Sequence, residues 1–131
     1  MYDVKLLRVI DLDPLTIINC KRLSYGDEGY MCEDLDAAIA KDKASRRRYR
    51  YSMACLVYDQ GTLVGWSLIE PVARSPRYVV QMFVDPNYRR KGIGRYLLQQ
   101  ANYMSKRKPL VYLDDDNEGF FHKNPDLYAE V

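Results

Sequence analysis

The chain has 131 residues, of which 47% are hydrophobic and 29% charged. This length suits one domain that buries its own core, and the composition excludes a disordered, collagen-like or coiled-coil chain. No apolar run approaches the roughly 20 residues that span a bilayer, and the first residues lack the pattern of a signal peptide. We therefore expect a single cytoplasmic domain over residues 1–131 that has no membrane partner.

The formal net charge of +2 conceals an uneven distribution along the chain. Residues 1–40 carry four Lys or Arg against eight Asp or Glu, residues 41–108 carry fifteen against four, and residues 109–131 carry one against six. A basic middle segment between acidic ends indicates a binding site for an anion in that segment.

Metal-ligating side chains are sparse. The three cysteines, Cys20, Cys32 and Cys55, are widely spaced, and His122 is the only histidine. Structural zinc sites use four Cys or His ligands at short spacings, so we expect no metal. Each cysteine is expected to be a small buried side chain.

The first predicted elements are a strand over residues 4–10 and a helix. Asp13 is a good helix N-cap, and Pro14 is tolerated at the first helical position that follows. We expect the buried side of this helix to consist of Leu15, Ile18 and Leu23.

A second helix is predicted over residues 33–45, because apolar residues recur there at helical spacing. These residues are Leu35, Ala38 and Ile39. The basic run Arg46–Arg50 that follows is either a solvated connection to a strand or a contact for an anion or a nucleic acid.

Residues 51–58 and 62–70 are two apolar runs around a short glycine-containing turn, which predicts a β-hairpin. Residues 78–84 are almost wholly apolar and predict a central strand. A helix over residues 92–106, a strand over residues 110–113 and a short helix within residues 114–123 complete the prediction. The order β-α-α-β-β-β-α-β-α is that of a mixed α/β domain, with one right-handed β-α-β crossover that makes its two strands parallel.

The most informative segment joins the central strand to the helix after it. Gly92 and Gly94 fall at the start of that helix, where unpaired backbone N–H groups and the helix dipole favour a phosphate. Four basic residues surround them, namely Arg89, Arg90, Lys91 and Arg95. The segment is neither a P-loop nor a Rossmann loop, because it lacks GxxxxGK[ST] and the third glycine of GxGxxG.

The pattern Arg-x-x-Gly-x-Gly at residues 89–94 resembles the pyrophosphate-binding motif of the GNAT acetyltransferase superfamily. The flanking run FVDPNYRRKGIGRYLL and the order of elements extend this resemblance over residues 3–123. The resemblance implies the GNAT acyl-CoA N-acyltransferase fold. It also implies transfer of an acetyl group from acetyl-CoA to a primary amine, by direct attack of the amine in a ternary complex.

The resemblance further implies where the coenzyme lies. The backbone amides of residues 90–95 would hold its pyrophosphate, and the end of the central strand would bind the pantetheine arm where that strand splays from the next one. The amide of Val84 would polarise the thioester carbonyl. The residues expected to contact the coenzyme are Met82, Phe83, Val84, Arg89, Arg90, Lys91, Gly92, Ile93, Gly94, Arg95, Asn117 and Phe121.

The general acid and base depart from the family pattern. The tyrosine that usually protonates the leaving thiolate is replaced by Phe121, so His122 and Tyr128 are the nearest substitutes. Glu70 is either the base or a solvent-facing strand end, and Asp114 belongs to a run of three carboxylates that is either catalytic or a solvated turn. The family's final hairpin also looks shortened, so a second subunit could complete the acceptor site.

Acidic residues in segment 27–36 and at residues 114–116 favour a cationic acceptor, such as a polyamine, an aminoglycoside-like amine, a lysine or an N-terminus. The alternative interpretation of these residues is ordinary helix and turn solvation. Two alternative functions remain open: a catalytically weak GNAT-fold module that binds CoA or a protein partner, and an RNA-directed (tRNA) acetyltransferase. A homodimer is a further expectation, because many members of this superfamily dimerise.

Overall fold

The computed structural model describes residues 2–24, 29–45, 50–104, 108–111 and 118–130. In chain order, the strands are β1 (Asp3–Arg8), β2 (Met53–Asp59), β3 (Thr62–Pro71), β4 (Tyr78–Val84), β5 (Leu110–Val111) and β6 (Ala129–Glu130). The α-helices are α1 (Pro14–Ser24), α2 (Gly29–Ala44), α3 (Ile93–Met104) and α4 (Glu118–His122), with 3-10 turns η1 (Val9–Asp11) and η2 (Pro86–Tyr88).

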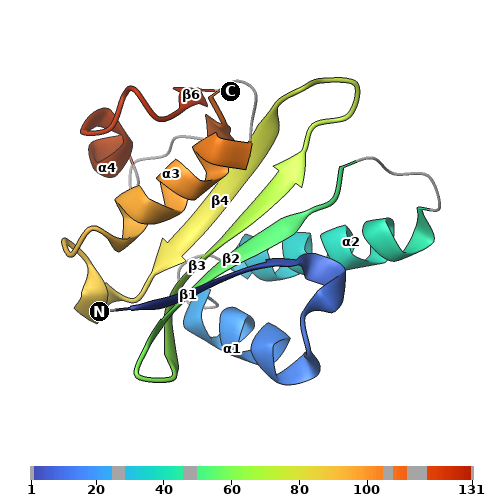
Figure 1. The fold of residues 1–131 in the computed structure, drawn as a ribbon, viewed down its shortest axis with the longest axis horizontal. Helices are drawn as coiled ribbons and strands as arrows, with labels where there is room; N and C mark the ends of the chain where they lie inside the picture. Colours follow the sequence, from blue (N-terminus) through green and yellow to red (C-terminus); the bar gives the residue numbers. More distant parts are fainter. Residues whose placement is uncertain (1, 25–28, 46–49, 105–107, 112–117, 131) are drawn as a thin grey trace.

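The strands of the described residues form one sheet whose spatial order, β1-β2-β3-β4-β5-β6, is also their order in the chain (Figure 1). Strands β1 to β4 pair antiparallel, whereas β4 with β5 and β5 with β6 pair parallel. The parallel pairing of β4 with β5 follows from the α3 crossover between them. The predicted mixed α/β fold and order of elements are confirmed, with β6 added after α4.

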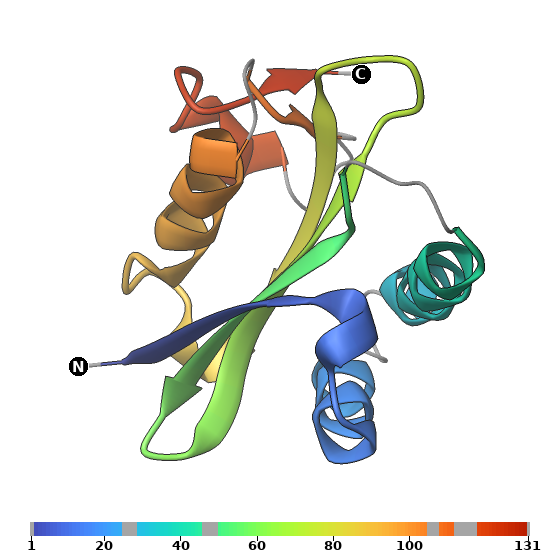
Figure 2. The ribbon, with the colours of Figure 1, turned by 45° about the vertical axis from the view of Figure 1, so that its right-hand side comes forward.

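The helices cover both faces of the sheet (Figure 2). Helices α1 and α2 lie on one face, where Cys20, Met31 and Leu35 pack with Trp66 and Phe83 of the sheet. Helix α3 lies on the other face, where its buried side chains belong to two clusters with sheet residues. Strand β4 therefore lies between the two helical layers and is covered on both faces.

Helix α1 begins as the sequence predicts but turns a different side to the core. The Asp13 carboxylate accepts a 2.7 Å hydrogen bond from the Thr16 amide, as an N-cap does. Leu23 packs against the core, but Leu15 is 66% exposed and Ile18 43% exposed, so their predicted burial is wrong. Apolar residues lie all round this helix, so packing of Cys20 onto the sheet, and not the apolar pattern, sets its orientation.

The remaining predictions of burial agree with the structure. Leu35 and Ala38 are buried on α2, and all three cysteines are buried. Burial raises the pKa of the Cys20 thiol to about 12 and that of Cys55 to about 11. Gln60 and Gly61, both at positive φ, make the hairpin turn between β2 and β3.

Within the described residues, no helix has the length and apolar character that a membrane span requires.

Candidate active site

The loop from β4 to α3 has the backbone of an anion site. After Val84 the chain passes through η2, where the Asp85 carboxylate accepts a 2.9 Å hydrogen bond from the Asn87 amide. Arg90 (φ 63°) and Gly92 (φ 85°) then take left-handed conformations and turn the chain into α3. The Tyr96 amide bonds to the Gly92 carbonyl, so the amides of residues 93–95 precede the first bond of the helix. These N–H groups at the positive end of the α3 dipole can bind an anion.

The two glycines of the motif have different structural roles. A Cβ atom built at Gly92 would meet no heavy atom within 4 Å, so this position has open space in front of it. Glycine is favoured at position 92 because the backbone there is left-handed. A Cβ atom at Gly94 would lie 3.2 Å from the ring of Phe120 on α4. Gly94 thus allows the C-terminal segment to pack against the first turn of α3.

All four basic residues of the motif are exposed, and two of them, Arg89 and Arg95, donate hydrogen bonds within the protein. Arg89 donates a 3.1 Å hydrogen bond to the Val84 carbonyl, and its guanidinium lies 5.4 Å from the centre of the Phe83 ring. Arg90 and Lys91 are also exposed. Arg95 donates a hydrogen bond to the Asn124 side chain, and so attaches the segment after α4 to α3.

Tyr88 ties this loop to the β2–β3 hairpin, whose turn lies at the same end of the sheet. Its hydroxyl donates a 2.7 Å hydrogen bond to the Asp59 carboxylate at the end of β2. That bond, with smaller contributions from burial and from the charge of Asp59, raises the pKa of Tyr88 above its ordinary value of 10. The Lys91 ammonium lies 5.3 Å from the centre of the Tyr88 ring. The loop is therefore held by β4, from which it begins, and by the bond between Tyr88 and β2.

The end of β4 presents main-chain groups toward β5. Strand β4 pairs with β3 along its whole length, whereas among the described residues its pairing with β5 is at Val79 and Leu110. The Asp85 amide donates to the Val64 carbonyl at 2.8 Å, and hydrogen-bonding direction alternates along an antiparallel pair. The N–H and C=O groups of Met82 and Val84 therefore point to the β5 side. A thioester placed along this edge could bond to them.

The candidate general acids lie around α4. Phe121 is 5% exposed and belongs to the cluster that contains Val80 and Leu98. The ring of Tyr128 is half-buried and lies 5.1 Å from the Phe121 ring, in the cluster to which Met82 also contributes. His122 is exposed at the end of α4. Asp114 and Asn117 lie outside the described residues.

Glu70 lies at the opposite end of β4 from the motif. It pairs with Val79, whereas Gly65 pairs with Val84, so five residues of β4 separate the two positions. At about 3.3 Å per residue, this separation is roughly 16 Å along the strand. Glu70 is thus remote from the Val84 amide.

Among the described residues, no group of three Cys, His, Asp or Glu side chains could hold a metal ion.

Arg50 is the one residue of the basic run 46–50 that the structure describes, and it bonds within the protein. Arg50 donates hydrogen bonds to the carbonyls of Val72 (2.7 Å) and Arg77 (3.2 Å), and its guanidinium lies 5.3 Å from the centre of the Tyr78 ring. It therefore supports the β3–β4 connection. Residues 46–49 lie outside the described residues.

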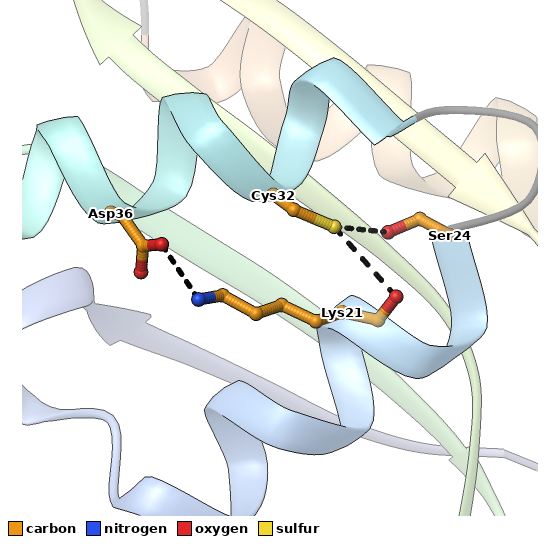
Figure 3. Close-up of polar contacts among 4 residues, drawn as sticks. All are labelled: Lys21, Ser24, Cys32 and Asp36. Atoms are coloured by element: carbon orange, nitrogen blue, oxygen red, sulfur yellow. Dashed lines mark hydrogen bonds and ion pairs between the residues drawn. The ribbon is translucent and has the colours of Figure 1, made fainter.

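The acidic residues of α2 have distinct partners. Asp36 forms a 2.7 Å ion pair with Lys21 of α1, beside the Cys32 thiol, which contacts the Ser24 hydroxyl and the Lys21 carbonyl (Figure 3). Asp34 instead accepts a 2.7 Å hydrogen bond from the Gln81 amide on β4. Sequence reasoning counted Asp34 among several acidic residues and did not single out Gln81. A polar residue within the apolar run of residues 78–84 was the available signal.

Comparison with known proteins identifies the family. The family model described as "Acetyltransferase (GNAT) domain" matches residues 51–128. No match was found among curated proteins.

Three similar solved structures agree in fold. The Escherichia coli ribosomal-protein-S18-alanine N-acetyltransferase is 14% identical, with 97% of this chain and 76% of that chain covered at a TM-score of 0.63.

Escherichia coli ElaA is 16% identical, with 95% of this chain and 86% of that chain covered at a TM-score of 0.65. AAC(6')-Iy, solved with the bisubstrate analog CoA-S-monomethyl-acetylneamine, is 14% identical, with 99% of this chain and 92% of that chain covered at a TM-score of 0.63. At these identities the solved structures show a shared fold, and the family model spans more than half of the sequence. This chain belongs to the GNAT acetyltransferase family.

Proposed function

We propose that the protein is an N-acetyltransferase that moves the acetyl group of acetyl-CoA to a primary amine in a ternary complex. The observation that carries the proposal is the β4–α3 loop. Arg90 and Gly92 turn there into α3 with open space in front of Gly92, and the exposed basic side chains are on the same loop. Membership of the GNAT family supports acetyl-CoA as the donor.

The residues of the loop fit the chemical groups of acetyl-CoA. The amides of Ile93, Gly94 and Arg95, with Arg89, Arg90 and Lys91, offer N–H donors and positive charge to the pyrophosphate. The main-chain groups of Met82 and Val84, with Phe83 between them, can bind the pantetheine arm and the thioester carbonyl. Asn117 and Phe121 remain further proposed contacts of the coenzyme.

In the proposed reaction, the neutral amine nitrogen attacks the carbonyl carbon of the thioester. A C–N bond forms, the C–S bond breaks, and one proton passes from nitrogen to the departing thiolate, so acetyl-CoA and amine become acetamide and CoA. The Val84 amide would stabilise the negative charge that develops on the carbonyl oxygen. Of the proposed acids and bases (Tyr128, His122, Glu70 and Asp114), Tyr128 is best supported, because its ring shares a cluster with Met82.

The acceptor is proposed to be a cationic primary amine. Two of the similar structures carry titles that name a ribosomal-protein-S18-alanine N-acetyltransferase and a complex with the bisubstrate analog CoA-S-monomethyl-acetylneamine. Both titles are compatible with amine acceptors of different size. The carboxylates of α2 on the sheet face opposite α3 support a positively charged acceptor.

Isothermal titration with acetyl-CoA tests the proposal. We expect the parent to bind with a Kd of roughly micromolar order and Gly92→Glu to weaken binding by at least about tenfold, because its carboxylate would repel the pyrophosphate. Gly61→Glu is the matched control, because Gly61 also has a positive φ and open space but lies in the hairpin turn. Absence of binding by the parent would contradict the proposal.

A catalytically weak module that binds CoA is the second candidate function. The observation that favours it is the buried phenylalanine, Phe121, at the position assigned to the family's acid. The two candidates differ in turnover. Release of free CoA thiol with spermidine, an aminoglycoside or a peptide N-terminus as acceptor supports the enzyme, and binding of acetyl-CoA without release supports the module.

A further inference from the structure

Strand β1 forms one edge of the sheet. Among the described residues, its neighbour in the sheet is β2 (Figure 1). The Val9 amide donates to the Ser52 carbonyl at 3.0 Å, and these two residues continue the register of the β1–β2 pair. Hydrogen-bonding direction alternates along an antiparallel pair, so the N–H and C=O groups of Val4 and Leu6 point away from β2. The outer side of β1 therefore offers main-chain donors and acceptors to another strand.

The two faces of β1 differ in chemistry. Val4 lies opposite Val57, which packs with side chains of α3, so Val4 and Leu6 are on the α3 face of the sheet. They are 40% and 43% exposed, so α3 does not cover them. Asp3 and Lys5 alternate with them, are exposed and lie on the α1–α2 face. This edge strand thus carries apolar side chains on one face and two opposite charges on the other.

A second copy of β1 fits this edge in a register that matches the charges. Two antiparallel copies related by a two-fold axis perpendicular to the sheet keep their α3 faces on the same side. An axis at Val4 places Asp3 of each copy opposite Lys5 of the other. An axis at Asp3 or at Lys5 would instead place that charged residue opposite itself, which is unfavourable. An axis at Leu6 would place Lys5 opposite Leu7 and lose the match of charges.

The register centred on Val4 is also apolar on the α3 face, where Val4 lies opposite Val4 of the second copy and Leu6 opposite its Tyr2. A charged side chain on an edge strand usually discourages pairing, but here each charge meets the opposite one. Within the described residues, neither Asp3 nor Lys5 forms an ion pair in its own chain. We propose that β1 is an interface between two copies of this chain, which pair antiparallel about a two-fold axis at Val4. The proposal is independent of acetyl-CoA binding, because β2 and β3 separate β1 from β4.

Charge reversal tests the register. The paired segment, residues 2–6 of each copy, is short, so we expect a weak dimer with a Kd of roughly tens of micromolar by sedimentation equilibrium. Asp3→Lys and Lys5→Asp each place like charges opposite each other and should weaken the dimer by about tenfold. The double variant restores opposite charges and should return the Kd to within about threefold of the parent. Asp126→Lys, the same change at an exposed residue after α4, is the matched control and should leave the Kd unchanged.

Three further variants test the geometry. Val4→Pro removes an N–H that points outward and no bond to β2, so the monomer should fold while the dimer is lost. Residues opposite each other at a hydrogen-bonded position have Cα atoms about 5.5 Å apart, which a disulfide can bridge. Val4→Cys should therefore cross-link to its own copy under mild oxidation, whereas Leu6→Cys, about 13 Å along the strand from its copy, should not. The parent, whose three cysteines are buried, is the control for oxidation, and circular dichroism verifies that each variant is folded.

Each result has a defined meaning. A dimer that the single reversals weaken and the double variant restores supports the interface, as does cross-linking of Val4→Cys alone. A parent that stays monomeric at every concentration overturns the proposal, and so does a dimer that Val4→Pro and both single reversals leave intact. Cross-linking of Leu6→Cys but not of Val4→Cys would show a different register and overturn this one. Titration of the parent with acetyl-CoA is a separate measurement, so failure of the interface and failure of the proposed function are distinguished.

Discussion

Single residues decide how the backbone of the motif is used in this chain. Gly92 supplies a left-handed conformation beside open space, whereas Gly94 supplies room for the Phe120 ring. Arg95, which the sequence places among the coenzyme contacts, donates a hydrogen bond to Asn124. The first turn of α3 thus serves both the proposed anion site and the attachment of the C-terminal segment.

Tyr128 is the residue whose replacement best tests the proposed acid. Because Phe121 has no hydroxyl, we expect Tyr128→Phe to lower kcat by about 100-fold and to change the KM for acetyl-CoA little. Initial rates of CoA-thiol release with spermidine would measure both parameters. Tyr103→Phe is the control, since Tyr103 is 84% exposed on α3. An unchanged kcat in Tyr128→Phe would eliminate Tyr128 as the acid.

At the scale of elements, the hydrogen bond between Tyr88 and Asp59 joins the motif loop to the β2–β3 hairpin. We expect Tyr88→Phe to raise the KM for acetyl-CoA several-fold with little change in kcat, because the loop loses one of its two attachments. Asp59→Asn in the Tyr88→Phe background should add almost nothing, since the two side chains act together. Additive effects of the two substitutions would show that the bond does not position the loop.

The same bond has a defined pH dependence. The pKa of Tyr88 is raised in the folded chain, chiefly by its hydrogen bond to Asp59, so its contribution to stability is present below about pH 10. That contribution declines as the pH rises through the higher folded value. The difference in melting temperature between the parent and Tyr88→Phe should therefore shrink above pH 10.

How well an element could be predicted depends on the range of the interactions that fix it. The β4–α3 segment follows from local chemistry, because an apolar run, Pro86 and two glycines define it within residues 78–94. The orientation of α1 depends on packing against distant strands, and so Leu15 and Ile18 were misplaced. The bond between Asp34 and Gln81 joins positions 47 residues apart, and no local pattern encodes such a pairing.

For the whole molecule, the buried thiols predict alkaline destabilisation. Burial raises the pKa of Cys20 from 9.0 to about 12, so its thiol ionises in the unfolded chain at a lower pH than in the folded one. Stability is therefore retained below pH 9 and falls as the pH rises toward 12, by up to about 1.4 kcal/mol per pH unit for this thiol. Urea unfolding of the parent and Cys20→Ala at several pH values would measure this slope. Equal slopes in the two proteins would contradict the prediction.

The agreement between the order of strands in the sheet and their order in the chain bears on how the molecule is made. A ribosome releases β1 first and β6 last, and each new strand finds its partner already at the exposed edge of the growing sheet. Among the described residues, no strand has to be inserted between two that have paired, although β1 meets its partner β2 only after α1 and α2 have been made. Because the order of pairing follows the chain, the strands can pair in the direction of translation, and β6 joins β5 last.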